Sequence, residues 1–351
     1  MATFWDRMRD LLLRMEQGRR PRGVTSAPTY VEPPHLDLGA RPPHPSPATQ
    51  EYPVTYPAAK VDTPDAVQER VFDPALKHFS RAFRLGDPVF EDPQVGARWR
   101  INRLQAMDHL LRVASTSPWK DHLVLRGSVL LKAWLGEAAR EPGDMDWVVS
   151  PKNLGIDDPL AREMIEGLVR LAADRPRAGE TRVEAARIAV DDIWTYERVP
   201  GRRVVFPWTA ANSPPGSVQM DFVFGEDLWS EPILTPIPTH DGDSVIVWAA
   251  SKEVALAWKL LWLETDSYPQ GKDLYDATLL AEQSRLPLSL LDRVLRASEY
   301  PPARELEPDF PLEWSVDWDS FKSEYPWVPG EAADWQARLT AALKPMFGPG
   351  K

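Results

Sequence analysis

The chain has 351 residues, with 41 Lys and Arg against 52 Asp and Glu, a formal net charge of −11, and no Cys. At roughly 150 residues per domain the length predicts about two domains, and the lack of Cys excludes disulfides, Cys-ligated metals and a cysteine nucleophile. These features predict a cytoplasmic protein; no apolar run reaches the about 18 residues of a membrane span, and the acidic balance excludes coating of nucleic acid by bulk charge.

The N-terminal part predicts a short helix followed by a linker. Over residues 1–20, apolar side chains recur at helical spacing beside several Arg, which predicts an amphipathic helix. This helix could pack against the rest of the chain, or it could dock on a partner protein or a membrane surface. Residues 21–64 are rich in Pro, which fixes φ and lacks an amide donor. We therefore expect an extended, disordered linker that forms neither a helix nor a central strand.

Residues 65–250 predict an α+β domain, and residues 251–351 a mostly helical one. Hydrophobic periodicity predicts helices over 67–83, 99–114, 129–135 and 158–173, and strands over 122–125, 145–149, 181–190, 193–199, 204–208, 217–224 and 244–248. From residue 251 the pattern becomes helical, over 253–264, 272–283, 288–297 and 334–343. The expected architecture is thus a mixed-sheet domain, a helical domain behind it, and a Pro-rich N-terminal extension.

Small and acidic residues lie at the ends of the first two predicted strands. Gly127-Ser128 joins a strand to a helix, where glycine permits close approach of a ligand and free helix amides suit a phosphate. This dipeptide alone is a weak signal. Asp144 and Asp146 lie two apart, so both carboxylates of a strand would point to one face, as a Mg²⁺ site requires. The alternative explanation is a solvated strand end or a turn cap.

A third carboxylate and a lysine occur in apolar surroundings. Asp221 lies between Met and Phe in a predicted strand, where burial is costly without a cation, unless the side chain faces water. Lys259 lies in an apolar helix, where it either snorkels or meets an anion. Asp273 falls in the first turn of the next helix, a position that the helix dipole alone would favour. Together, the three strand acids match the two-metal arrangement of phosphoryl transfer.

In this order, the segments resemble the AbiEii/AbiGii-type nucleotidyltransferase toxins of the DNA polymerase β-like nucleotidyltransferase superfamily, over about residues 123–280. The resemblance implies Mg²⁺ or Mn²⁺ at Asp144, Asp146 and Asp221. It also implies an NTP substrate whose phosphates are held at Gly127, Ser128 and Lys259, and an essential acid at Asp273 that could act as base for the acceptor hydroxyl. Such enzymes transfer nucleotides to tRNA 3′ ends and are controlled by an antitoxin, which implies a toxin–antitoxin or phage-defence role.

The sequence departs from this pattern where the family carries arginines. Lys272 stands where an Arg usually precedes the last acid, and Trp262, Leu263 and Glu264 replace an Arg expected a turn after Lys259. An inactive nucleotidyltransferase fold used as a binding module therefore stays an alternative, as does transfer to a protein hydroxyl. A sugar-nucleotide glycosyltransferase is disfavoured, because the Pro-rich stretch leaves little room for the nucleotide-binding unit such an enzyme needs before its acidic motif.

Arginines cluster over residues 170–203 of this acidic chain. Because a polyanion needs a local basic face, we expect an RNA acceptor to bind through this region, with Arg202 and Arg203 as contacts. Acidic residues interleave with these arginines, so an ordinary solvated surface is the alternative.

Overall fold

The computed structural model describes residues 52–61, 63–76, 79, 81–175, 177–195, 199–298 and 306–348. The helix predicted over 1–20 and the predicted linker as far as residue 51 lie outside this part of the chain. The described residues belong to one compact unit, which combines a mixed sheet with helices. The α+β class expected from the sequence is confirmed.

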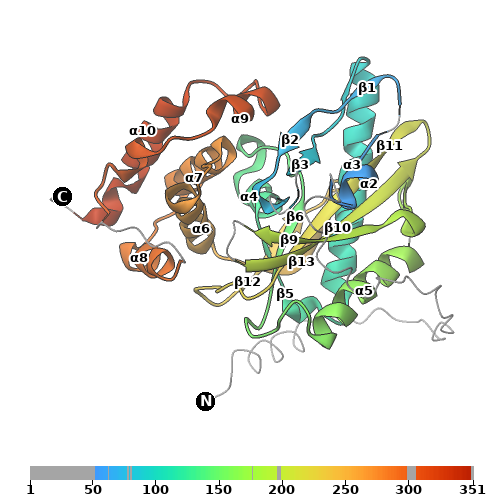
Figure 1. Ribbon diagram of the computed structural model, residues 1–351, viewed down its shortest axis with the longest axis horizontal. Coiled ribbons are helices and arrows are strands. Elements are labelled where there is room, and N and C mark those ends of the chain that lie inside the picture. The colour runs from blue at the N-terminus through green and yellow to red at the C-terminus, as the bar shows by residue number, and fades with distance from the viewer. Residues whose placement is uncertain are drawn as a thin grey trace. The chain divides into compact units, whose positions relative to one another are not determined.

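A nine-stranded sheet organises this unit (Figure 1), with the order β12-β13-β5-β6-β11-β10-β8-β7 and β9 paired to β10. The strands are β5 (Leu123–Arg126), β6 (Met145–Val149), β7 (Arg177–Ala178), β8 (Thr181–Val183), β9 (Ala189–Thr195), β10 (Val199–Ala210), β11 (Ser213–Val223), β12 (Ile233–Pro238) and β13 (Ser244–Ala249). Strand β6 runs parallel to β11, and β13 runs parallel to β5. The other neighbours are antiparallel, so the sheet is mixed.

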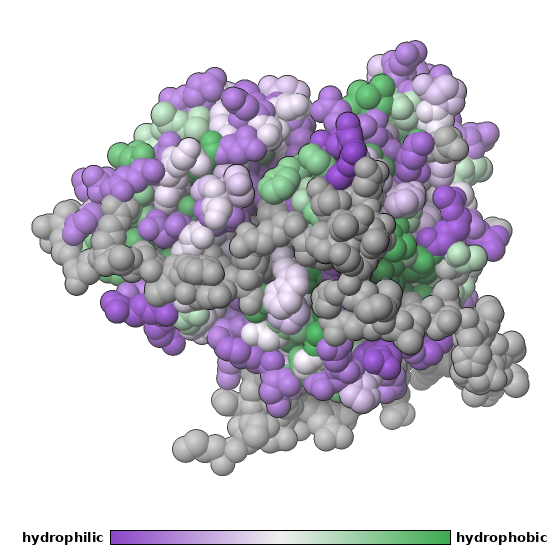
Figure 2. All heavy atoms as spheres, in the orientation of Figure 1, coloured by the Kyte–Doolittle hydropathy of each residue, from purple (hydrophilic) through white to green (hydrophobic). Residues whose placement is uncertain are grey.

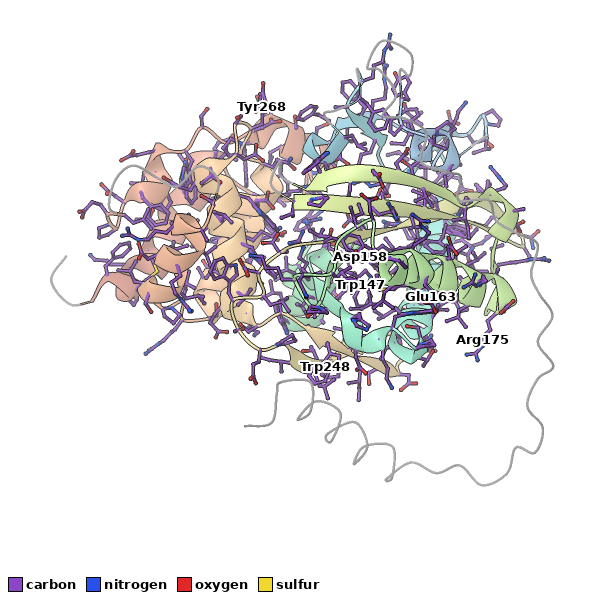
Figure 3. All side chains as sticks on the ribbon, turned by 60° about the horizontal axis from the view of Figure 1, so that its bottom comes forward. Trp147, Asp158, Glu163, Arg175, Trp248 and Tyr268 are labelled. Carbon is purple, nitrogen blue, oxygen red and sulfur yellow. The ribbon has the colours of Figure 1, made fainter. Side chains whose placement is uncertain are left out.

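The central strands are apolar on both faces because helices and loops cover the sheet. Leu125 of β5 and Val148 of β6 are fully buried, and Trp147 (Figure 3) has almost no exposed surface. Helices α3 (Pro93–Thr116) and α5 (Pro159–Asp174) contact each other, and α3 also contacts β11 and β13. Helix α3 begins where Asp92 accepts a hydrogen bond from the Gln94 amide, with a proline in the first turn.

The described chain after the sheet is mostly helical. Its helices are α6 (Lys252–Thr265), α7 (Gly271–Gln283), α8 (Leu288–Arg296), α9 (Trp318–Glu324) and α10 (Ala332–Leu343), drawn in orange and red in Figure 1. Short 3-10 helices are η1 (Pro74–Leu76), η2 (Lys120–His122), η3 (Gly136–Ala138), η4 (Ala185–Arg187), η5 (Phe310–Glu313) and η6 (Lys344–Phe347). The side chain of Ser251 caps α6 by accepting from the Val254 amide. Helix α4 (Ser128–Leu135) contacts both β6 and α7.

The helix predicted over 67–83 is wrong. This segment contributes β1 (Ala66–Val67), β2 (Arg70–Phe72) and the start of β3 (Phe83–Leu85), and β4 (Val89–Phe90) follows it. Strands β1 and β4 pair with each other, and β2 pairs with β3. The pair Asp73-Pro74 explains the error, because a residue before proline is disfavoured in a helix and favours extended backbone.

Three smaller expectations also need correction. The predicted linker contains a short helix, α2 (Thr55–Ala58), whose Thr55 amide and hydroxyl donate to Asp191 at 2.7 and 2.8 Å. The strand predicted over 181–190 is interrupted by η4. Strand β12 was missed because it contains Pro236 and Pro238, which an edge strand tolerates since one side of its backbone needs no partner.

The face shown in Figure 2 is mainly hydrophilic where residues are described, with separate apolar patches between the charged side chains. In the described part of the chain, no helix combines the length and the apolar character needed to cross a membrane.

Candidate functional site

Three carboxylates meet at neighbouring strands of the sheet. Asp146 lies in β6 and Asp221 in β11, and these two residues stand opposite each other in the parallel register. Asp144 immediately precedes β6. One carboxylate oxygen from each residue lies within 4.8 Å of the other two. The sequence-predicted triad therefore converges on one point, with the oxygen donors that a divalent cation requires.

The Gly127-Ser128 turn lies against this triad. Gly127 has φ of 79°, and a Cβ atom there would stand 2.1 Å from Oδ2 of Asp146, so the backbone must approach this carboxylate without a side chain. Ser128 begins α4, is buried, and donates from its hydroxyl to Oδ1 of Asp144 at 3.3 Å. The strand-to-helix turn and the acidic pair thus form one continuous structure.

The clustered charges perturb one another strongly. Burial, together with the negative charges of Asp144 and Asp221, raises the pKa of Asp146 to about 7. Burial also raises the pKa of Asp221, although Arg203 opposes the change. The pKa of Asp144 is lowered instead: burial opposes ionisation there, but Lys272 and other nearby cations outweigh it. A cation between these groups would relieve the repulsion, so the donor set fits a divalent metal.

Arg203 is part of this cluster and does not lie on an exposed face. It is buried, with Nε 3.0 Å from Oδ1 and Nη2 2.8 Å from Oδ2 of Asp221, and Nη1 2.9 Å from Oδ2 of Asp73. Arg202 donates from Nε to Asp192 at 3.0 Å on the adjoining strand. The guanidinium of Arg203 is therefore engaged by two carboxylates, and the RNA contact through Arg202 and Arg203 stays a prediction.

Lys259 forms a second buried cluster with two acids of α7. Its Nζ lies 2.7 Å from Asp273 and 3.0 Å from Asp276, and Arg140 donates to both oxygens of Asp276 at 3.2 and 3.0 Å. Burial alone would lower the pKa of Lys259, but the charges of Asp273 and Asp276 raise it, so the ammonium stays protonated.

A cavity of about 600 Å³ connects these groups. Its wall includes Gly127, Ser128, the three triad acids and Lys259, but Asp273 is not among the residues that line it. Asp273 is 1% exposed and accepts a hydrogen bond from Lys259. Its carboxylate is therefore buried against the lysine and does not line the cavity.

Several residues in the cavity wall were not predicted as site residues. They include Asp73, Arg84, Arg103, Arg126, Arg140, Lys272 and Tyr325. Arg140 lies between the Gly127-Ser128 turn and Asp144, and Lys272 directly precedes Asp273, so both lie next to residues that the sequence had singled out. Arg126 packs over Trp258 and Trp262, with ring centroids 5.3 and 5.5 Å from its Cζ. Asp73 and Arg84 lie in the segment misread as helix or its continuation, which gave no signal.

A family model matches about two thirds of this chain. The model of the family described as "Nucleotidyl transferase AbiEii toxin, Type IV TA system" matches residues 109–340 of the 351-residue chain. The triad, the Gly127-Ser128 turn and Lys259 all fall inside the matched range, whereas Asp73 and Arg84 precede it. A search of the curated proteins gave no match.

Proposed function

Because the chain belongs to the AbiEii nucleotidyl transferase toxin family, it is an enzyme of the nucleotidyl-transferase class, and we propose that it transfers a nucleoside monophosphate from an NTP to an RNA end. The observation that carries this proposal is the convergence of Asp144, Asp146 and Asp221 on one point in the cavity wall. Three carboxylates this close need a cation to offset their mutual repulsion, and nucleotidyl transfer needs cations beside the triphosphate.

Mg²⁺ or Mn²⁺ is the proposed cofactor, with one carboxylate oxygen of each triad residue as ligand. When bound, such a cation supplies positive charge to the reacting phosphate and to the departing pyrophosphate. Burial and the neighbouring carboxylates raise the pKa of Asp146 to about 7, so this residue would give up its proton when the site binds a cation. Ser128 orients Asp144 through its hydroxyl.

The NTP phosphates are proposed to bind at Gly127, Ser128 and Lys259. The absence of a side chain at Gly127 brings the start of α4 next to the triad, and helix N-terminal amides favour an anion. Lys259 lines the cavity as a protonated ammonium. Its ion pairs with Asp273 and Asp276, two buried residues that do not line the cavity, fix its position. Asp273 is accordingly proposed as a positioning residue and not as the base.

The proposed acceptor is a tRNA end, and a type IV toxin–antitoxin family implies a cognate antitoxin as partner. Support for an anionic acceptor comes from the cavity wall, where Arg84, Arg100 and Lys272 are found in a chain with a net charge of −11. We place the reaction in the cytoplasm, where NTPs and tRNA occur together, as part of a defence against phage.

Transfer of label from each α-labelled NTP tests this function. The full chain is incubated with Mg²⁺ and total tRNA, or with total protein, and Asp146→Asn is the matched inactive variant. We expect label in tRNA with the wild-type chain and none with the variant. Label in protein, including the enzyme itself, would favour transfer to a hydroxyl of a side chain. No label in any acceptor would contradict catalysis and leave the inactive binding module.

A further inference from the structure

Asp73 shares one guanidinium with a triad acid, although it precedes the family-matched residues. It directly follows β2 and is almost completely buried. Its Oδ2 lies 2.9 Å from Nη1 of Arg203, while Nε and Nη2 of the same arginine bind the two oxygens of Asp221. Asp73 and Asp221 therefore occupy separate edges of one planar group, which fixes the orientation of that group.

The Asp73 carboxylate is itself held firmly. Its Oδ1 accepts from the Ala75 amide at 3.0 Å, and its own amide donates to the Ala82 carbonyl at 3.0 Å. Burial opposes ionisation, but Arg203, Arg84 and Lys272 lower the pKa of Asp73 to about 2. The side chain is thus a fixed negative charge, with one oxygen bound to backbone and the other to Arg203.

The charge of Asp73 decides how much of the negative charge of Asp221 remains available to bind a cation. With Asp221 as its sole partner, Arg203 would neutralise that carboxylate and make it a poor metal ligand. With Asp73 as a second partner, the two acids and one arginine carry a net charge of −1, and the bidentate contact still orients Asp221. Outer-shell carboxylates commonly tune metal ligands in this way.

We propose that Asp73 is a positioning residue of the active site, which acts through Arg203 to hold Asp221 in its cation-binding orientation and to preserve its charge. This inference rests on the proposed function in one respect, because it requires the triad to bind a divalent cation. It extends the active site to hairpin β2–β3, upstream of the residues that define the family.

Mn²⁺ binding to the full chain, measured by electron paramagnetic resonance without nucleotide, tests the proposal apart from catalysis. Asp73→Asn keeps the shape of the side chain and removes its charge, and we expect about tenfold weaker Mn²⁺ binding. Asp65→Asn is the matched control, because Asp65 is an exposed residue of the same segment and does not line the cavity. Its affinity should equal that of the wild type.

The route through Arg203 is tested by a double-mutant cycle. Arg203→Gln removes the connecting guanidinium, so Asp73→Asn should cause no further loss of Mn²⁺ affinity in that background. Additive losses would overturn the positioning role. Equal affinities of the wild type and Asp73→Asn would overturn the inference alone, whereas a wild type that binds no Mn²⁺ would overturn the proposed metal site and the inference with it.

Circular dichroism shows whether each variant is folded. If Asp73→Asn fails to fold, Asp73→Glu replaces it, because glutamate keeps the charge and moves the carboxylate by one methylene. We then expect about threefold weaker Mn²⁺ binding, and wild-type affinity in this variant would overturn the positioning role.

Discussion

Arg84 of β3 and Glu324 of α9 form an ion pair with 3.3 Å between Nη2 and Oε2, although 240 residues separate them in the sequence. Both side chains belong to the cavity wall. A second contact lies close by in sequence: the ring of Phe72 packs edge-on against Tyr268, labelled in Figure 3, with centroids 5.8 Å apart. Hairpin β2–β3 therefore contacts the helical part of the chain through side chains of both its strands, and one of these contacts lies in the cavity wall.

Arg84→Ala should weaken substrate binding more than it weakens the fold. The guanidinium is only partly buried and lies in the cavity wall where the anionic acceptor is proposed to bind, so its loss should raise the KM for the tRNA acceptor about threefold to tenfold, with little change in kcat. A partly exposed ion pair such as this one contributes at most about 1 kcal/mol to the free energy of unfolding. Steady-state kinetics and thermal melting measure the two effects. Glu324→Gln breaks the same ion pair but keeps the cation; an equal rise in KM for both variants would contradict a role in binding.

Asp146→Asn should stabilise the metal-free protein at alkaline pH while abolishing activity. The pKa of Asp146 rises from 3.8 to about 7 on folding, so between these values the folded state binds more protons than the unfolded state. The free energy of unfolding from this group therefore falls as pH rises through that window. We expect about 1–3 kcal/mol of stabilisation by the variant at pH 8 and none near pH 4. Urea unfolding of the wild type and the variant, in the presence of a chelator at pH 8 and pH 4, measures this difference in free energy. A variant less stable than the wild type at pH 8 would contradict the charge cluster.

Cation binding should depend on pH for the same reason. Below pH 7 a proton must leave Asp146 before its oxygen can bind the metal, so the affinity for Mg²⁺ or Mn²⁺ should fall as pH is lowered from 8 to 6. Calorimetry in buffers with different ionisation enthalpies should show release of nearly one proton per cation at pH 6. A constant affinity over this range would place the cation away from Asp146.

Lys259→Met should destabilise the protein strongly, because it leaves Asp273 and Asp276 buried without the ammonium. Removing one partner of such a buried pair costs about 3–5 kcal/mol in the free energy of unfolding. Lys132→Met is the matched control, since Lys132 forms partly exposed ion pairs with Glu137 and Glu141. Denaturant unfolding should show a loss of less than about 1 kcal/mol for the control. Similar losses for both lysines would contradict the buried network.

The local sequence singled out the three triad acids as candidates, because each acid interrupts or borders a short apolar strand. Asp144 and Asp146 are two residues apart, and Asp221 has Met and Phe as neighbours. The parallel pairing of β6 with β11, which brings Asp146 opposite Asp221, is a long-range event that no local pattern encodes. The order of the family motifs supplied the missing information.

Arg203 and Asp73 could not be found in the same way. Arg203 follows Arg202 in an arginine-rich stretch, so composition suggested an exposed face, whereas strand alternation turns these two side chains to different partners. Asp73 binds Arg203 across 130 residues of sequence. Its local context, Val-Phe-Asp-Pro, contains a helix-breaking signal that the hydrophobic periodicity of the surrounding residues obscured.

The cavity wall runs in sequence from Ala59 to Tyr325, so the chain contributes to it almost from the first described residue to the last helices. A nascent chain leaves the ribosome from its N-terminus and folds as it emerges. The triad acids are therefore synthesised well before Lys259, and the residues around α9 come later still. A chain that has been translated only as far as the triad acids therefore lacks the ammonium of Lys259 and the cavity-wall residues of α9. This order of synthesis delays the assembled site until the residues up to Tyr325 have been translated.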